Sequence, residues 1–340
     1  MKLMIVGSGE QHAIEAHYVK YLKKEGLDVH LFPAQSIFYR YYNESTFNKF
    51  IFKAGLSPIY TMIGNQLLEE VNRNKPDIVW VIKGMEIQAA YLKKIRQLGI
   101  KLVNYNPDNP FLFSGIGSGN VNITEGIPLY DLHFTYDHFI ANKILAQYGI
   151  PVSILPFGYD IHEDWYNECI QEKEVSKVCF IGNPDPARVT LLNEITYKVP
   201  VVVFGHNWSK FILNKNMEVH QPVYDKEFWK VLYRYRVQLN MMRPHNPNSH
   251  NMRSFEIPAI GGIGLYPDTP DHRNFFENGK EVFLYSNESD CITQAEKILN
   301  MDKLQQLQIR TNARKRSASS GYSYCCRAAF VAAEMIKLLS

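Results

Sequence analysis

The sequence has few cysteines, no long apolar run and almost no net charge. Five cysteines among 340 residues are an odd number without C-x-x-C spacing, which indicates neither a disulfide framework nor a zinc site. No apolar run approaches the roughly 18 residues that a membrane-spanning helix needs. The apolar start at residues 1–6 is broken by Gly7, so we expect no signal peptide.

The formal charge of +3 gives no reason to expect nucleic acid as a partner. We therefore expect a cytoplasmic protein.

The composition is that of a folded globular chain, with 46% apolar and 21% charged residues. A length of 340 residues is comfortable for two domains, each able to bury its own core. The composition shifts in the polar run at 168–177. We therefore place one domain at residues 1–157 and a second at residues 176–322.

The first residues predict a βαβ unit. Lys2–Val6 is a predicted strand, Gly7 to Gly9 a turn, residues 11–25 a helix and residues 29–32 the next strand. The turn lacks the third glycine of the dinucleotide fingerprint, and no acidic residue ends the second strand. An NAD-dependent dehydrogenase is therefore disfavoured.

The second half begins with the same pattern. A predicted strand at 178–181 is followed by a turn at Gly182-Asn183 and by a helix from Pro186. Arg188 lies in the first turn of that helix, although a helix N-terminus prefers negative charge. A bound diphosphate would supply the anion; the structural alternative is an arginine that reaches out to solvent.

The stretch 251–262 predicts a short helix that is opened by Ser249 or Asn251 and stopped by a glycine pair. Arg253 and Glu256 lie on one face of it. Free N–H groups at a helix start favour an anion such as a diphosphate, and Arg253 would add a bidentate contact. The carboxylate oxygens of Glu256 suit the paired hydroxyls of a ribose. An exposed ion pair between the two side chains is the alternative.

The same stretch carries a longer motif. The words F-E-I-P-A-I-G-G-I-G-L-Y, P-D-T-P-D and F-F-E-N-G-K-E-V-F-L-Y resemble the C-terminal signature of the group 1 glycosyltransferases, in the branch similar to the CgeB spore-maturation proteins. The resemblance implies an α/β fold of the GT-B type, with two Rossmann-like domains facing across a cleft and a helix at about 323–340 that packs back on the first. It also implies transfer of a sugar from a nucleotide-sugar to an acceptor hydroxyl, in polysaccharide or glycoconjugate biosynthesis.

The resemblance further implies roles for single residues. A glutamate at the position of Glu256 holds the donor ribose, a basic residue like Arg188 grips the donor, and the first turn of the chain approaches the donor phosphate. Relatives carry a second glutamate eight residues before the first, where this chain has Asn248. The segment like Val223-Tyr224 lies against the nucleobase. The catalytic candidates from the first turn are Glu10 and His12, and the remaining donor-binding candidates are Gly9, Gly182, Asn183, Arg188, His206, His250, Asn251 and Arg253. For His12, a solvated histidine at a helix start is the alternative.

No metal and no cofactor are expected. His245 and His250 are not accompanied by an Asp-x-Asp motif, and the resembled fold needs no metal. The nucleotide-sugar is itself the substrate.

Asp108 is the predicted carboxylate for the acceptor. It follows the predicted strand 101–105, and parallel sheets bind ligands at the carboxyl ends of their strands. There it would orient or deprotonate an acceptor hydroxyl; the alternative is an Asx turn between two prolines. The glycine-rich loop 114–120 after it is predicted to close over the acceptor.

Residues 38–53 are rich in Tyr, Phe, Lys and Arg. Such a segment either lies on anionic lipid at the inner face of the membrane or forms a helical insertion whose aromatic side chains pack inward. We expect packing, because the segment is short and carries few positive charges.

Two rival functions stay open at this point. A nucleotide-sugar epimerase can share the two-domain frame, and a non-catalytic sugar or nucleotide binder would explain why Asn248 replaces the second glutamate.

Overall fold

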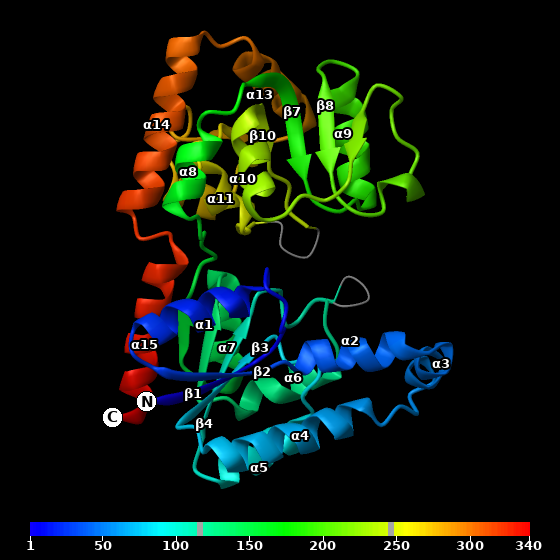
Figure 1. The fold of residues 1–340 in the computed structure, drawn as a ribbon, viewed down its shortest axis with the longest axis vertical. Helices are drawn as coiled ribbons and strands as arrows, with labels where there is room; N and C mark the ends of the chain where they lie inside the picture. Colours follow the sequence, from blue (N-terminus) through cyan, green and yellow to red (C-terminus); the bar gives the residue numbers. More distant parts are fainter. Residues whose placement is uncertain (114–117, 244–247) are drawn as a thin grey trace. The chain divides into compact units, whose positions relative to one another are not determined.

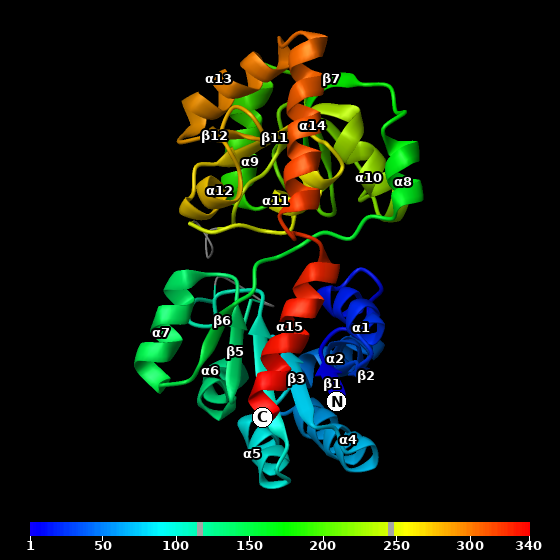
Figure 2. The same cartoon turned by 90° about the vertical axis from the view of Figure 1, so that its left-hand side faces the viewer.

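The computed structural model describes residues 1–113, 118–243 and 248–340. The chain divides into two compact units (Figures 1 and 2): Met1–Pro156 together with Tyr324–Ser340, and Phe157–Ser323. The second unit includes residues 158–175, which stand outside both predicted domains, and Phe157, which we placed in the first. His245 and part of the glycine-rich loop 114–120 lie outside the described residues.

The first unit contains a six-stranded parallel sheet in the order β2-β1-β3-β4-β5-β6. All five residues of the central strand β3 are buried, as expected of a strand that is covered on both faces. The chain order reverses between β1 and β3, so their carboxyl ends form the usual ligand-binding edge. The strands are β1 (Lys2–Val6), β2 (Asp28–Phe32), β3 (Ile78–Ile82), β4 (Lys101–Asn106), β5 (Leu132–Thr135) and β6 (Val152–Ile154).

The helices of this unit come from both ends of the chain. The final helix, α15, packs against α1, as Figures 1 and 2 show. The rings of His17 and Tyr324 stack at 4.6 Å, and Ser153 Oγ donates to Glu334 Oε2 at 2.6 Å. The helices are α1 (Ile14–Lys24), α2 (Ala34–Glu44), α3 (Thr46–Lys53), α4 (Ile59–Asn74), α5 (Ala89–Gln97), α6 (Val121–Gly126), α7 (His138–Tyr148) and α15 (Tyr324–Leu339), with a 3-10 turn at Ile127–Leu129.

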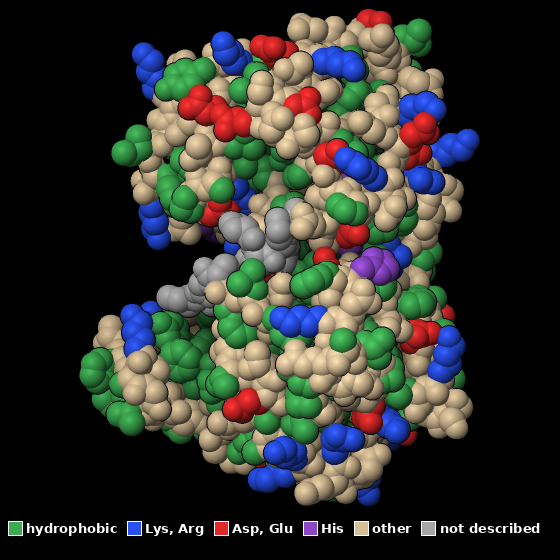
Figure 3. Space-filling view, turned by 180° about the vertical axis from the view of Figure 1, so that it is seen from behind, with side chains coloured by type: hydrophobic (Ala, Val, Ile, Leu, Met, Phe, Trp, Pro, Cys, Tyr) green, Lys and Arg blue, Asp and Glu red, His purple; other side chains and the backbone are tan. Residues whose placement is uncertain are grey.

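Helices α2 and α3 form the insertion that the aromatic segment predicts. The ring of Phe38 lies 5.0 Å from that of Phe52 and 5.9 Å from that of Tyr60, so these side chains pack inward. Phe47 and Phe50 do not: each remains about two-thirds exposed. Figure 3 shows hydrophobic side chains gathered at the outer end of this insertion. Inward packing is therefore correct for one face of α3 and wrong for the other.

The second unit repeats the architecture with the strand order β12-β11-β10-β7-β8-β9. All pairings are parallel, and here the chain order reverses between β7 and β10. The strands are β7 (Val175–Ile181), β8 (Val201–Phe204), β9 (Glu218–His220), β10 (Tyr235–Leu239), β11 (Gly264–Pro267) and β12 (Phe283–Tyr285). The helices are α8 (Glu163–Cys169), α9 (Pro186–Thr196), α10 (Asp225–Arg234), α11 (Arg253–Ala259), α12 (Pro270–Phe275), α13 (Glu288–Leu299) and α14 (Lys303–Ser319), with a 3-10 turn at Trp208–Lys210.

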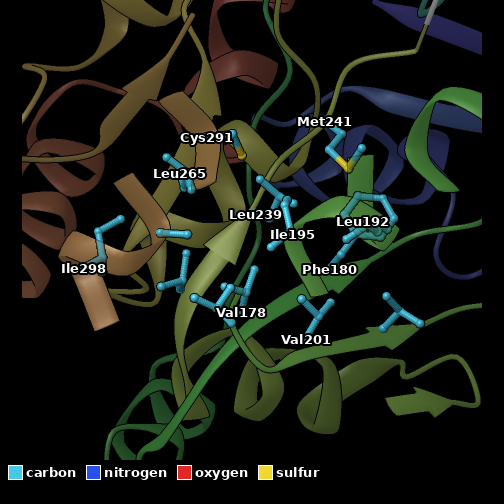
Figure 4. Close-up of a cluster of buried hydrophobic side chains, with 14 of the residues drawn as sticks. Val178, Phe180, Leu192, Ile195, Val201, Leu239, Met241, Leu265, Cys291 and Ile298 are labelled. Atoms are coloured by element: carbon cyan, nitrogen blue, oxygen red, sulfur yellow. The ribbon is translucent and has the colours of Figure 1, made fainter. Parts of the chain in front are cut away.

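The core of this unit fixes the carboxyl edge of the sheet. Figure 4 shows Val178 of β7, Leu239 of β10 and Leu265 of β11 facing side chains of α9 and α13. Helix α10 covers the other face, where Val231 packs on β7 and β8. Burial on both faces holds the ends of β7 and β10 side by side. No helix among the described residues is long and apolar enough to cross a membrane.

Candidate functional site

Arg188 lies where the order of the second sheet reverses. Its Nη1 donates to the carbonyl of Asn183 after β7, and its Nη2 donates to the carbonyl of Met241 after β10, both at 3.0 Å. The guanidinium also lies 5.2 Å from the centroid of the Phe180 ring. One buried arginine therefore joins the two strand ends at the edge where a parallel sheet binds ligands.

The electrostatic environment of Arg188 differs from the prediction. Asp185 caps α9 by accepting the Arg188 N–H at 3.0 Å, and its other carboxylate oxygen lies 3.3 Å from Arg188 Nε. The protein itself thus supplies the negative charge that we expected from a diphosphate. The alternative of an arginine reaching solvent is also wrong, because the side chain is buried.

Two further arginines add positive charge there. Burial is the main cause that lowers the pKa of Arg188 to about 10; Asp185 opposes the shift, whereas Arg243 and Arg253 reinforce it. Asp185 is paired with Arg188 and Glu256 with Arg253, so the two carboxylates balance two of the three guanidinium groups and one positive charge remains to attract an anion.

Arg253 and Glu256 form the ion pair that was the structural alternative. Arg253 Nη1 donates to Glu256 Oε2, and the guanidinium lies 4.4 Å from the centroid of the Phe228 ring. The pair is not freely exposed, because Glu256 is 7% exposed. Helix α11 holds the two residues on one face, as predicted from their spacing.

The start of α11 differs from the prediction. The helix begins at Arg253 rather than at Ser249 or Asn251. The Ser254 N–H donates to Asn251 Oδ1, and the N–H groups of Phe255 and Glu256 donate to the carbonyl of Met252. These three N–H groups are used within the turn, so the expected anion site on free amides is wrong for them.

The turns after β7 and β8 bring several predicted residues together. Asn183 Oδ1 accepts the His206 N–H at 2.9 Å, and His206 Nε2 lies 3.1 Å from Tyr224 Oη. Both rings are exposed, whereas Val223 packs partly into the core against β7 and β8. A Cβ on Gly205 would lie 2.2 Å from the Gly182 carbonyl oxygen, so the close approach of the two turns requires glycine there.

His250 and Asn251 are used inside the protein. His250 Nδ1 lies 2.6 Å from Asp271 Oδ2, and its Nε2 accepts the N–H of Phe157 at 3.3 Å. The side chain is fully buried and both ring nitrogens have partners inside the protein, and the donor-binding role of His250 stays a prediction. Asn251 is half-buried and donates its amide to Asn240 Oδ1 at 2.8 Å, so it braces the loop before α11.

The first turn of the chain holds Gly9, Glu10 and His12 at the carboxyl end of β1. All three residues are exposed. The Gly9 N–H donates to Ser36 Oγ at 3.0 Å, and the Glu10 N–H donates to Ser8 Oγ at 3.2 Å. The side chains of Glu10 and His12 stay candidates, but the two amides already have acceptors and are not free for a phosphate.

Asp108 lies at the end of β4 in the same unit. Its carboxylate pairs with Lys83 Nζ at 2.7 Å, and its N–H donates to Asn106 Oδ1 at 3.0 Å. The Asx turn of this segment is thus made by Asn106, and the carboxylate of Asp108 is paired with a cation. An ionised Asp108 can accept a hydrogen bond from a hydroxyl.

Glu86 is a further acidic group at this edge, and the sequence analysis missed it. Burial is the main cause that raises its pKa to about 7; the carboxylate of Glu15 adds to the shift and Lys83 opposes it. Glu15 is itself buried and accepts the Ser8 N–H at 2.8 Å. The position of Glu86, four residues after β3, was the available signal, because β3 borders the reversal of the sheet order.

Replacing Glu86 by glutamine should change how stability depends on pH. Below a pH of about 4.5 the carboxyl is protonated in both states. As the pH rises towards about 7 the unfolded chain ionises first, so the native state loses up to about 3 kcal/mol. The Glu86→Gln variant escapes this loss. We therefore expect the thermal midpoint of the variant to exceed that of the original protein by more at pH 8 than at pH 5.

The groups facing Glu86 are Lys83, Glu15 and Tyr60. Glu10→Gln, an exposed carboxyl in the neighbouring turn, is the matched control and should show no such difference. An equal effect of Glu86→Gln at both pH values would contradict a neutral, buried Glu86.

Among residues 1–113, 118–243 and 248–340, no group of three or more His, Cys, Asp or Glu side chains could hold a metal ion. The absence of a metal from the reaction stays a prediction.

Residues 188–333 match the family model described as "Glycosyl transferase-like". They contain Arg188, Arg253 and Glu256 and most of the second unit. No curated protein matches the sequence. Residues 188–333 are therefore glycosyl transferase-like, and the predicted class of enzyme is confirmed over these residues.

Solved structures with the same fold cover the whole chain. Sucrose-phosphate synthase from Thermosynechococcus elongatus matches with a TM-score of 0.68 and 8% identity, over 100% of this chain and 99% of its own. HepE from Anabaena, in complex with UDP-glucose, matches with a TM-score of 0.66 and 11% identity over 99% and 100%. A putative UDP-N-acetylglucosamine 2-epimerase from Listeria monocytogenes matches with a TM-score of 0.61 and 16% identity over 98% and 95%. The predicted α/β fold of the GT-B type is confirmed.

Proposed function

We propose that the protein is a glycosyltransferase that binds its nucleotide-sugar donor at the carboxyl edge of β7 and β10. Two observations carry the proposal: Arg188 is held between the ends of β7 and β10, and Arg253 and Glu256 form an ion pair on α11. Phosphates need cations, and a ribose needs an acceptor for its hydroxyls. The site supplies both within one unit.

The arginines have a direct role in the chemistry. Negative charge builds on the leaving diphosphate as the glycosidic bond breaks, and cations held in place beforehand stabilise it. Arg188 is fixed by two carbonyls and Asp185, so it needs no rearrangement. Arg253 is paired with Glu256. When the ribose hydroxyls bind that carboxylate, the guanidinium of Arg253 can bind a phosphate instead.

The exposed rings of His206 and Tyr224 suit the nucleobase. They lie beside Asn183, where a planar base can stack and form hydrogen bonds. The uridine diphosphate of UDP-glucose, the ligand of HepE, is the first nucleotide to test.

The acceptor is proposed to use the first unit. Asp108 is the candidate that accepts a hydrogen bond from the acceptor hydroxyl, and Lys83 Nζ lies 2.7 Å from its carboxylate. Glu10 and His12, exposed in the turn after β1, are the other candidates. This proposal also includes membership of the CgeB-like branch, a role in polysaccharide or glycoconjugate biosynthesis and independence of metal.

A thermal-shift panel of nucleoside diphosphates tests donor binding. A ligand that binds only the native state raises the midpoint by mass action, and a concentration of 100 times Kd adds about 2.7 kcal/mol. We expect one nucleoside diphosphate to raise the midpoint by several degrees and its parent nucleoside to raise it far less. Equal, negligible shifts with every nucleotide would contradict the proposal.

The epimerase neighbour supports one rival function. An epimerase converts the nucleotide-sugar without an acceptor, whereas a glycosyltransferase leaves it intact or slowly hydrolyses it. Nuclear magnetic resonance of the sugar after incubation with the protein alone separates the two. A non-catalytic sugar or nucleotide binder with a decayed site would show no turnover in an assay across candidate donors and acceptors.

A further inference from the structure

Helix α3 exposes an apolar surface on the first unit. Phe47 is 67% exposed, Phe50 is 68% exposed, and Leu56, just beyond the helix, is 76% exposed. Phe47 and Phe50 are three residues apart and share one face of the helix. We call Phe47, Phe50 and Leu56 the α3 patch.

The exposure is not the result of a loosely packed helix. On the opposite side of α3 the ring of Phe52 lies 5.5 Å from that of Tyr42 and 5.7 Å from that of Tyr60. Ser45 caps the helix by accepting the Asn48 N–H at 3.0 Å, and the Asn48 amide donates to the Tyr41 carbonyl at 2.9 Å. The inner face is thus fixed, which keeps Phe47 and Phe50 pointed away from the core.

The charge around the patch is mainly positive. Lys53 is exposed at the end of α3 and Arg40 is exposed on α2, whereas Lys49 is half-buried with its Nζ 5.6 Å from the centroid of the Tyr42 ring. Glu44 is the one acidic residue in the sequence from 34 to 68, and its carboxylate accepts from the Asn48 amide at 3.2 Å. Apolar side chains flanked by cations match a bilayer interface that contains anionic lipid.

The geometry points to a membrane-docking surface: we propose that the α3 patch inserts into the interface of an anionic bilayer while Arg40 and Lys53 contact its headgroups. A second copy of the chain fits less well. Three apolar side chains are far fewer than the roughly 20–30 residues that a stable protein interface uses on each side. Membrane contact of this kind is reversible, because each side chain inserts only to the headgroup boundary.

The test is co-sedimentation of the full chain with vesicles of phosphatidylcholine, with and without phosphatidylglycerol. We expect binding to the anionic vesicles, and less of it at high salt. The double variant Phe47→Ala/Phe50→Ala should lower the partition coefficient about tenfold or more, since each phenylalanine contributes apolar area. Lys53→Glu should lower it through charge alone, without touching the aromatic packing.

Phe139→Ala is the matched control, because Phe139 is 72% exposed but lies on α7. It should bind vesicles like the original protein. Unchanged thermal midpoints would show that all variants are folded.

If the original protein fails to bind anionic vesicles, or the patch variants bind as well as it does, the proposal is wrong. Concentration-dependent self-association that the patch variants abolish would assign the surface to a second copy instead. The proposal does not depend on donor binding, which the nucleotide panel measures separately.

Discussion

Replacing Glu256 with alanine should weaken binding of the nucleoside diphosphate by about 100-fold or more. The carboxylate is the proposed acceptor for two ribose hydroxyls, and hydrogen bonds to a charged group contribute about 1.5–3 kcal/mol each. Calorimetric titration measures the loss. Pyrophosphate, which has no ribose, should bind the variant at least as well as the original protein, because Arg253 is released from its ion pair.

The control for this variant is Glu277→Ala. Glu277 forms an ion pair with Lys280 at the same three-residue spacing, but both side chains are more than half exposed. Its removal should leave nucleotide affinity unchanged. If Glu256→Ala also leaves it unchanged, Glu256 does not hold the ribose.

Replacing Arg188 with methionine should affect both stability and binding. The carbonyls of Asn183 and Met241 would lose their donors at a buried edge, which costs about 3 kcal/mol in the free energy of unfolding. The variant should therefore melt several degrees lower. It should also lose most of the midpoint shift caused by the nucleoside diphosphate, since the fixed cation is gone. Arg188→Lys keeps the charge but cannot reach both carbonyls, so it should retain part of that shift.

Arg273→Met is the matched control, because Arg273 is an arginine paired with an aspartate, Asp268, but is mostly exposed. Its loss should leave both the thermal midpoint and the nucleotide-induced shift nearly unchanged. If the nucleotide raises the thermal midpoint of Arg188→Met, from its own lowered value, by as much as it raises that of the original protein, then Arg188 has a purely structural role.

The sheets of both units follow closely from the sequence. Continuous apolar runs such as 78–82 and 178–181 are typical of buried parallel strands, and a glycine turn after the first strand of each half marks the βαβ repeat. The α3 helix shows where periodicity is insufficient. Its aromatic side chains are dense enough to predict a packed insertion, but only the folded chain shows which face α2 covers.

The site was less predictable, because its contacts join residues that are distant in the sequence. The spacing of Arg253 and Glu256 predicts their shared face, since it is local. The bond from Arg188 to the Met241 carbonyl spans 53 residues, and the one between His250 and Phe157 spans 93. Glu86 was missed for the same reason: its raised pKa results from burial beside Glu15, which a chain pattern does not reveal.

The central claim is that Glu256 and the arginines at the ends of β7 and β10 hold the ribose and diphosphate of a nucleotide-sugar. A crystal structure with the nucleoside diphosphate selected by the thermal-shift panel tests it most directly. The account predicts ribose hydroxyls within hydrogen-bond distance of the Glu256 carboxylate, and phosphate oxygens beside Arg188 or Arg253. Nucleotide bound elsewhere, with Glu256 still paired to Arg253, would contradict it.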